Sequence, residues 1–163
     1  MLRALLDRFF ISPFERAFDY DASYMRAVLK ASPWTLLKFS MVSGLVARRD
    51  APAEALAVAG IVATLREDCG PCTQIGVDMA QKGGVNGRVL RAILVGDEAA
   101  MGPTAALAYR FAHASLDHSL DADPLRDEIA ARWGHKALVA ISLALVTGRM
   151  YPTLKYALGY GKA

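Results

Sequence analysis

The sequence predicts a single all-α domain. Apolar residues recur at steps of three and four along most of the chain, as helices with one buried face require. No segment alternates apolar and polar residues between hairpin turns, so β-strands are not indicated. A chain of 163 residues, 54% of them hydrophobic, is long enough for one domain with a real core. We expect one domain over 1–163, with an N-terminal helical arm over 1–31 and a core over 32–163.

An amphipathic pattern and a helix-start signal predict the first helices of the chain. Charged residues interrupt the apolar ones in 1–20, which predicts a short amphipathic helix. Such a helix can touch a membrane surface, but more often packs on its own domain or on a neighbouring subunit. Ser32 then provides a helix cap, and Pro33 suits the first helical position. We expect the helix that begins there to end near Arg48.

The middle of the chain carries the clearest helix pattern. The alanine-rich segment Ala53–Arg66 has large apolar residues at helical spacing and predicts a buried helix. A helix continues over Thr73–Lys82 and stops at Gly83 and Gly84, which suit a left-handed cap. Asn86 can cap the next helix, Gly87–Val95.

Proline at helix starts and glycine past helix ends divide the rest of the chain. The expected helices run from Pro103 to about Leu120, from Asp123 to Gly134, from Lys136 to Arg149, and from Pro152 to Gly159.

Composition narrows the function classes. The net charge is only +3 and the basic residues are scattered, so we expect no nucleic-acid partner. The longest uninterrupted apolar candidates, Ala137–Gly148 and Ala55–Leu65, are shorter than a membrane span and read as core helices. No secretory signal is evident over 1–20. We therefore expect a cytoplasmic protein without a membrane partner.

The most informative stretch is Cys69-Gly70-Pro71-Cys72, which holds the only two cysteines. The same four residues form the redox motif associated with thioredoxin, where a β-strand leads into the motif. Here the preceding segment, Ala53–Arg66, has a helix pattern over more than three turns. The sequence therefore disfavours the thioredoxin fold but keeps a Cys-x-x-Cys at a helix start.

This position favours redox chemistry. Cys69 would lie at the helix cap and Cys72 in the first turn, where free N–H groups and the helix dipole stabilise a thiolate. The three-residue spacing puts both sulfurs on one face, close enough to form a disulfide. The pair is thus suited to thiol–disulfide exchange or peroxide reduction.

Three structural alternatives compete with this interpretation. The cysteines can be small core residues, although Gly70 and Pro71 make a plain core position awkward. Zinc needs two more ligands, and His113 and His118 do not share a helix face, so we expect no metal site. The absence of a secretion signal disfavours a structural disulfide.

The segment Glu-Asp-Cys-Gly-x-Cys after an alanine-rich helix, in a helical domain of this size, resembles the carboxymuconolactone decarboxylase and alkylhydroperoxidase D-like superfamily. The flanking stretches "DYDASYMRAVLKASP" and "YPTLKYALGYG" are also similar to segments of that superfamily. The resemblance implies a helical domain that assembles as homo-trimers or homo-hexamers. It also implies that Cys72 attacks a peroxide, that Cys69 resolves the product as a disulfide, and that a dihydrolipoyl protein supplies the electrons.

Two departures from that family bear on its proton relay. The peroxidase branch has a histidine four residues after the second cysteine and a glutamate twelve before the first, where this chain has Gly76 and Ala57. Glu67 is the first candidate for a substitute proton acceptor, although its negative charge would also raise a thiol pKa. Asp68 is at least as well explained as a charge that complements the helix dipole.

The leading hypothesis is a thiol-dependent peroxidase or disulfide oxidoreductase with Cys72, Cys69 and Glu67 as its site residues. We expect a hydroperoxide or disulfide substrate, a dihydrolipoyl or thioredoxin-like reductant, and no bound cofactor. The alternative is an oligomeric protein whose dithiol senses redox state or is structural. A decarboxylase-like enzyme comes third, because that branch lacks the cysteine pair.

Overall fold

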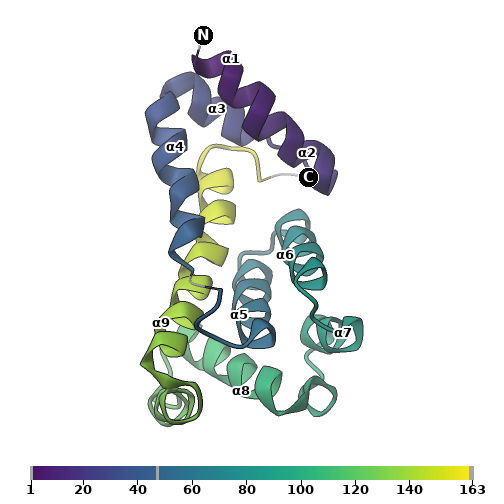
Figure 1. Cartoon of the computed structure of the whole chain (residues 1–163), viewed down its shortest axis with the longest axis vertical. Coiled ribbons are helices and arrows are strands. Elements are labelled where there is room, and N and C mark those ends of the chain that lie inside the picture. The colour runs from purple at the N-terminus through teal and green to yellow at the C-terminus, as the bar shows by residue number, and fades with distance from the viewer. Residues whose placement is uncertain (1, 47, 162–163) are drawn as a thin grey trace. The chain divides into compact units, whose positions relative to one another are not determined.

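The chain is all-helical, as the sequence predicts (Figure 1). A computed structural model describes residues 2–46 and 48–161, and no β-strand occurs among them. The strand that a thioredoxin fold needs before its dithiol is replaced by a helix. The dithiol is therefore presented by helices alone within the described part of the chain.

The described residues form nine α-helical elements and two short helical turns of other types. The α-helices are α1 (Leu2–Leu6), α2 (Ser12–Phe18), α3 (Ser23–Ala31), α4 (Pro33–Met41), α5 (Ala53–Arg66), α6 (Gly70–Lys82), α7 (Gly87–Val95), α8 (Glu98–Leu116) and α9 (Ala122–Ala157). A π-helical turn, η1 (Asp7–Ile11), joins α1 to α2, and a 3-10 turn, η2 (Val42–Leu45), follows α4.

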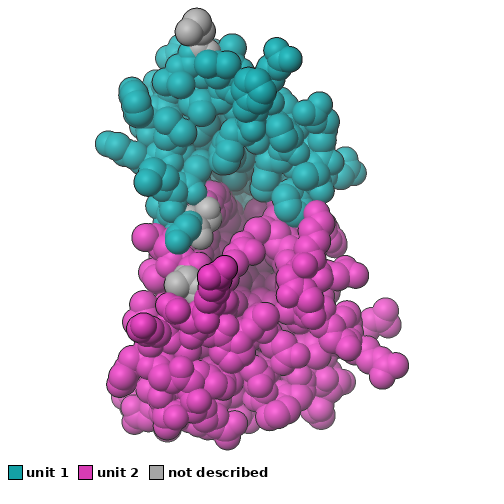
Figure 2. Space-filling model, viewed as in Figure 1, with its two compact units in different colours: residues 1–44, 153–163 teal, residues 45–152 magenta. Residues whose placement is uncertain are grey.

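The elements fall into two compact units (Figure 2). Unit 1 comprises residues 1–44 and 153–163, and unit 2 comprises residues 45–152. A single domain with an arm over 1–31 and a core over 32–163 stays a prediction.

Helix α5 is the centre of unit 2. It contacts α6, α7 and α8, which lie around it (Figure 1). Its buried residues point in several directions, as expected for a helix that is apolar on most sides. These residues are Ala55, Val58, Ala59, Ile61, Val62, Ala63 and Thr64. Because four of these residues, Ala55, Ala59, Ala63 and Thr64, have small side chains, other helices can approach α5 closely, and α6 with its dithiol is among them.

The capping residues confirm several predicted boundaries. The Ser32 side chain accepts a hydrogen bond from the Thr35 backbone N–H, and Asn86 accepts one from the Arg88 N–H. Satisfying a free N–H of the first turn fixes where a helix begins. The predicted bounds of α5 and α7 are confirmed at both ends.

Other predicted boundaries were wrong. Helix α4 ends at Met41 and tightens into η2 instead of continuing to near Arg48. Helix α8 begins at Glu98, because Asp97 caps it by accepting the Ala100 N–H, and a left-handed Gly102 breaks it before Pro103. It ends at Leu116, four residues before the predicted end.

The last helix is longer than predicted. The predicted interruption at Gly134 is present, with φ of 85°, but α9 then runs through Pro152 to Ala157 without a second break. Proline is preferred in first turns, yet packing can hold it inside a helix, and Pro152 is fully buried.

Helix α9 is also long and apolar enough, by length and composition, to cross a membrane. A core helix of a soluble protein meets the same criteria, and α9 contributes Ala137, Ile141 and Leu145 to the buried residues. The cytoplasmic location stays a prediction.

An arginine holds the helices of unit 1 together. Arg26 of α3 donates from Nη1 and Nη2 to the two carboxylate oxygens of Glu15, both at 2.6 Å, and from Nε to Asp7 at 2.9 Å. The hydrogen bonds from Arg26 are the main reason that the pKa of Glu15 lies below its usual value. Arg26 thus links α3 to η1 and α2.

Candidate functional site

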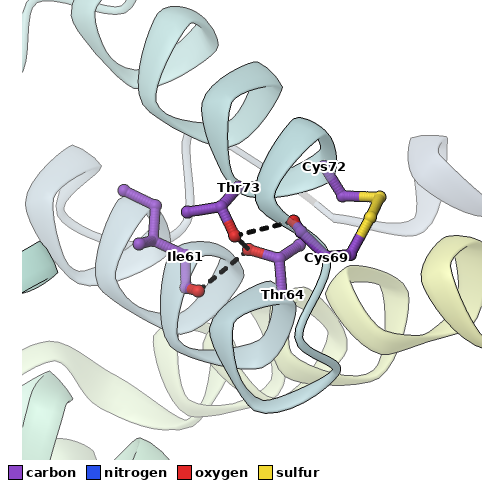
Figure 3. The surroundings of a disulfide bond; sticks show 5 residues. All are labelled: Ile61, Thr64, Cys69, Cys72 and Thr73. Carbon is purple, nitrogen blue, oxygen red and sulfur yellow. Dashed lines mark hydrogen bonds between the residues drawn. A yellow bond between two sulfur atoms is a disulfide. The ribbon is translucent and has the colours of Figure 1, made fainter. Parts of the chain in front are cut away.

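The two cysteines lie at the start of α6 and form a disulfide (Figure 3). Cys69 is the N-cap residue, Cys72 is the third residue of the helix, and their Cα atoms are 5.3 Å apart. Pro71 occupies the first turn, where its missing N–H costs no helical hydrogen bond. The predicted placement of Cys69 at the cap and Cys72 in the first turn is confirmed.

The disulfide is buried under an exposed turn. Cys69 and Cys72 are only 3% and 8% exposed, whereas Gly70 and Pro71 between them are exposed. Reagents therefore have little access to the disulfide unless the first turn of α6 opens. Such local opening is a common property of short surface turns.

A buried pair of threonines anchors this turn to α5. The Thr64 hydroxyl donates to the Ile61 carbonyl at 2.9 Å. The Thr73 hydroxyl lies 3.1 Å from Thr64 Oγ1 and 3.0 Å from the Cys69 carbonyl oxygen, and its single hydrogen serves one of these acceptors at a time. The two hydroxyls meet between α5 and α6, and the sulfur atoms lie on the side away from them (Figure 3). The Thr73 hydroxyl thereby holds the Cys69 backbone carbonyl on the side opposite to the sulfur atoms.

Glu67, the third predicted site residue, is paired with a cation from far along the chain. Arg149 of α9 donates from Nε to Glu67 Oε1 at 2.5 Å across 82 residues of sequence. The Glu67 side chain is 14% exposed, so water screens this pair less than a fully exposed one. Glu67 lies two residues before Cys69, and Arg149 offsets its negative charge beside the dithiol.

A close helix crossing brings Arg149 to this place. A Cβ atom on Gly148 would lie 2.7 Å from Ala63 Cβ and 3.0 Å from the Gly60 carbonyl oxygen, closer than side-chain atoms normally approach. Only glycine therefore fits at position 148 while α9 keeps its distance from α5. Sequence reasoning missed Arg149, although the small residues on both helices were a signal for a close crossing.

Gly76 and Ala57 stand where the peroxidase branch of the superfamily that the sequence resembles carries its relay residues, and both positions face the protein interior. A Cβ atom on Gly76 would point toward Ile61 Cγ1, 3.5 Å away, in the core. Ala57 is half-buried and packs against the same core. Neither position offers an acid or a base to the dithiol.

The histidines lie at other places in unit 2. The His113 ring packs at a tilt on Tyr109, with centroids 4.4 Å apart, and burial, followed by the nearby Arg66, lowers its pKa. His135 is exposed just after Gly134 and lines a surface pocket of about 270 Å³ with Asp50 and Lys136. Within residues 2–46 and 48–161, no three His, Cys, Asp or Glu side chains are grouped to hold a metal ion.

The fold and the site define a class: an all-helical protein with a Cys-x-x-Cys disulfide at the start of a helix that follows another helix. No protein-family model, curated protein or solved structure matches the chain. The resemblance to the alkylhydroperoxidase D-like superfamily therefore stays a prediction that depends on the motif residues.

Proposed function

We propose that this protein is a thiol–disulfide oxidoreductase of the alkylhydroperoxidase D-like type that reduces hydroperoxides with Cys72 and Cys69. The observation that carries the proposal is the Cys69–Cys72 disulfide at the first turn of α6. A helix start favours the thiolate, and a partner sulfur already within bonding reach allows the oxidised cysteine to be resolved without a large chain movement.

In the proposed cycle, the Cys72 thiolate attacks the terminal oxygen of a hydroperoxide. The O–O bond breaks, Cys72 becomes a sulfenic acid, and the alkoxide takes up a proton and leaves as an alcohol. The Cys69 thiol then attacks the Cys72 sulfur, forming the disulfide and releasing water. A dihydrolipoyl or thioredoxin-like dithiol reduces the disulfide, becomes oxidised itself, and returns two thiols.

Glu67 is proposed to accept the thiol proton before the attack. Its carboxylate is two residues from Cys69 and is held by Arg149. Arg149 supports this role because it offsets the negative charge of Glu67, which on its own would disfavour a nearby thiolate. Gly76 and Ala57 supply no acid or base, whereas Glu67 lies two residues before Cys69 with its carboxylate bound to Arg149.

The remaining parts of the proposal concern assembly and location. We propose a homo-trimer or homo-hexamer, as the resemblance implies, and a cytoplasmic location. Large apolar side chains on unit 2 are exposed and would be covered in such an assembly. They include Leu94, Val95, Val139 and Val146.

A second function, a redox-sensing or structural disulfide without turnover, is favoured by one observation. Both cysteines are at least nine-tenths buried, which slows attack by small oxidants and by a protein reductant. The same disulfide would then stabilise the first turn of α6 instead of cycling.

The deciding experiment measures hydroperoxide consumption with dihydrolipoamide as the reductant. The proposal expects sustained turnover for the wild type and none for Cys72→Ser. Cys69→Ser should react once, leaving a sulfenic acid on Cys72 that dimedone traps. A disulfide that forms reversibly without sustained turnover would favour the sensor, and dimedone on Cys69 instead of Cys72 would reverse the proposed roles.

A further inference from the structure

The first helical segment of unit 1 exposes an apolar face that the fold does not cover. Leu2, Leu5 and Phe9 follow one another at steps of three and four residues, so they lie on one side of α1 and η1. All three are exposed, and Phe9 is 68% exposed. Phe10 is exposed beside them, whereas Ile11 is fully buried in unit 1. The sequence-based expectation that this helix packs on its own domain therefore does not hold for this face.

Arginines accompany the apolar face. Arg3 and Arg8 are exposed on the same short segment, and the Arg8 guanidinium lies 5.6 Å from the centre of the Phe9 ring. Arginine beside an aromatic ring is the arrangement that amphipathic helices use at a membrane surface, where the ring enters the headgroup boundary and the guanidinium meets phosphates.

The charge of the chain is concentrated in the unit that carries this face. Unit 1 has eight Lys and Arg against four Asp and Glu, a net charge of +4. Unit 2 has eleven against twelve, a net charge of −1. Two of the four acids of unit 1, Asp7 and Glu15, are bound to Arg26. Lys155 of the same unit is buried, so the remaining charged residues of unit 1 keep a net charge of +4.

We propose that α1 and η1 form a membrane-surface binding element that lies on anionic phospholipid bilayers, with Leu2, Leu5 and Phe9 inserted and Arg3 and Arg8 at the lipid phosphates. The helical run that contains the element, residues 2–18, is shorter than a membrane-crossing helix needs and carries charged residues along its length, so it lies in the surface plane. Anionic lipid suits a unit of net charge +4. A second copy of the same face is a poorer partner, because two such basic units would repel. This inference is independent of the proposed redox function.

Vesicle flotation of the full chain tests the proposal. We expect binding to vesicles of phosphatidylcholine and phosphatidylglycerol in equal parts, little binding to phosphatidylcholine alone, and loss of binding in about 0.5 M salt, where charges are screened within a few ångströms. Phe9→Ala should weaken partitioning about tenfold through lost apolar burial. Arg8→Glu should weaken it at least about fivefold on the anionic vesicles only.

The matched control is Leu120→Ala, which shortens an apolar side chain that is 87% exposed on unit 2. It should leave partitioning unchanged, and circular dichroism should show the same helix content for all variants. Equal binding to neutral and anionic vesicles, or equal loss for Leu120→Ala and Phe9→Ala, would overturn the proposal. So would a solution oligomer that Phe9→Ala dissociates while vesicle binding is unaffected, since a second copy would then cover this face.

Discussion

Replacing Gly148 with alanine should destabilise unit 2, although alanine is the better helix former. The added Cβ would lie 2.7 Å from Ala63 Cβ and 3.0 Å from the Gly60 carbonyl oxygen. Neither is the end of a flexible side chain, so the variant must move α9 away from α5. Arg149, the next residue, would move with it and lose its close contact with Glu67.

The size of the effect is a difference between two terms. Overpacking a close helix crossing costs about 1–3 kcal/mol. The helix propensity of alanine over glycine returns up to about 1 kcal/mol. We expect a net loss of about 1–2 kcal/mol, and the thermal midpoint of a chain of this size falls by about 2–4 °C for each kcal/mol.

Denaturant unfolding and the alkylation rate of the reduced dithiol measure the result. Gly60→Ala is the matched control, because its Cβ would meet nothing within 4 Å and it should gain about 0.5–1 kcal/mol. Gly148→Ala should also slow alkylation, because Glu67 without Arg149 beside it disfavours a thiolate. If Gly148→Ala were as stable as Gly60→Ala, the close crossing and its role in placing Arg149 would be refuted.

Three further predictions concern the dithiol, the core and unit 1. Reducing the disulfide should lower the free energy of unfolding by about 2 kcal/mol, which is the chain-entropy value for so short a loop. The thermal midpoint should fall in dithiothreitol, and Cys72→Ser should show the same lower midpoint without reductant. Gly76→His should destabilise the chain by at least about 1 kcal/mol without restoring a relay, because the added ring meets Ile61. Gly76→Ala should be tolerated, and equal stability of the two variants would contradict this prediction. Glu15→Gln should lower stability by about 1 kcal/mol near neutral pH and by less at about pH 3. The hydrogen bonds from Arg26 lower the folded-state pKa of Glu15, so the stability that Glu15 contributes is present above its unfolded pKa and is lost as pH falls through its folded pKa. Denaturant midpoints of the wild type and Glu15→Gln should therefore converge in acid. Midpoints that stay equally far apart at both pH values would disprove the role of the Glu15–Arg26 pair.

Local signals in the sequence predict much of this fold. The apolar pattern gave the bounds of α5, the Asn86 cap gave the start of α7, and the helical approach to Cys69 disfavoured a thioredoxin-like strand. These features depend on residues within one or two turns of each other, and pattern reasoning is most reliable at that range. The same reasoning placed a break at Gly134, where the backbone is left-handed.

Features that depend on packing were missed. A proline start was predicted at Pro152, but the residue is buried inside a continuous α9, because tertiary contacts outweighed its preference for first turns. The partner of Glu67 was not predicted, since Arg149 is 82 residues away and only the crossing at Gly148 brings it near. The Thr64 and Thr73 hydroxyls under the dithiol were missed for a similar reason, because their bond joins two helices.

The central claim is that Cys69 and Cys72 form a reversible redox couple in the folded protein. Alkylation of the native chain followed by mass spectrometry tests it directly. The account predicts two alkyl groups after treatment with dithiothreitol, none after treatment with a stoichiometric hydroperoxide, and two again after a second reduction. Thiols that stay unoxidised with hydroperoxide, or a disulfide that dithiothreitol opens only after unfolding, would contradict it.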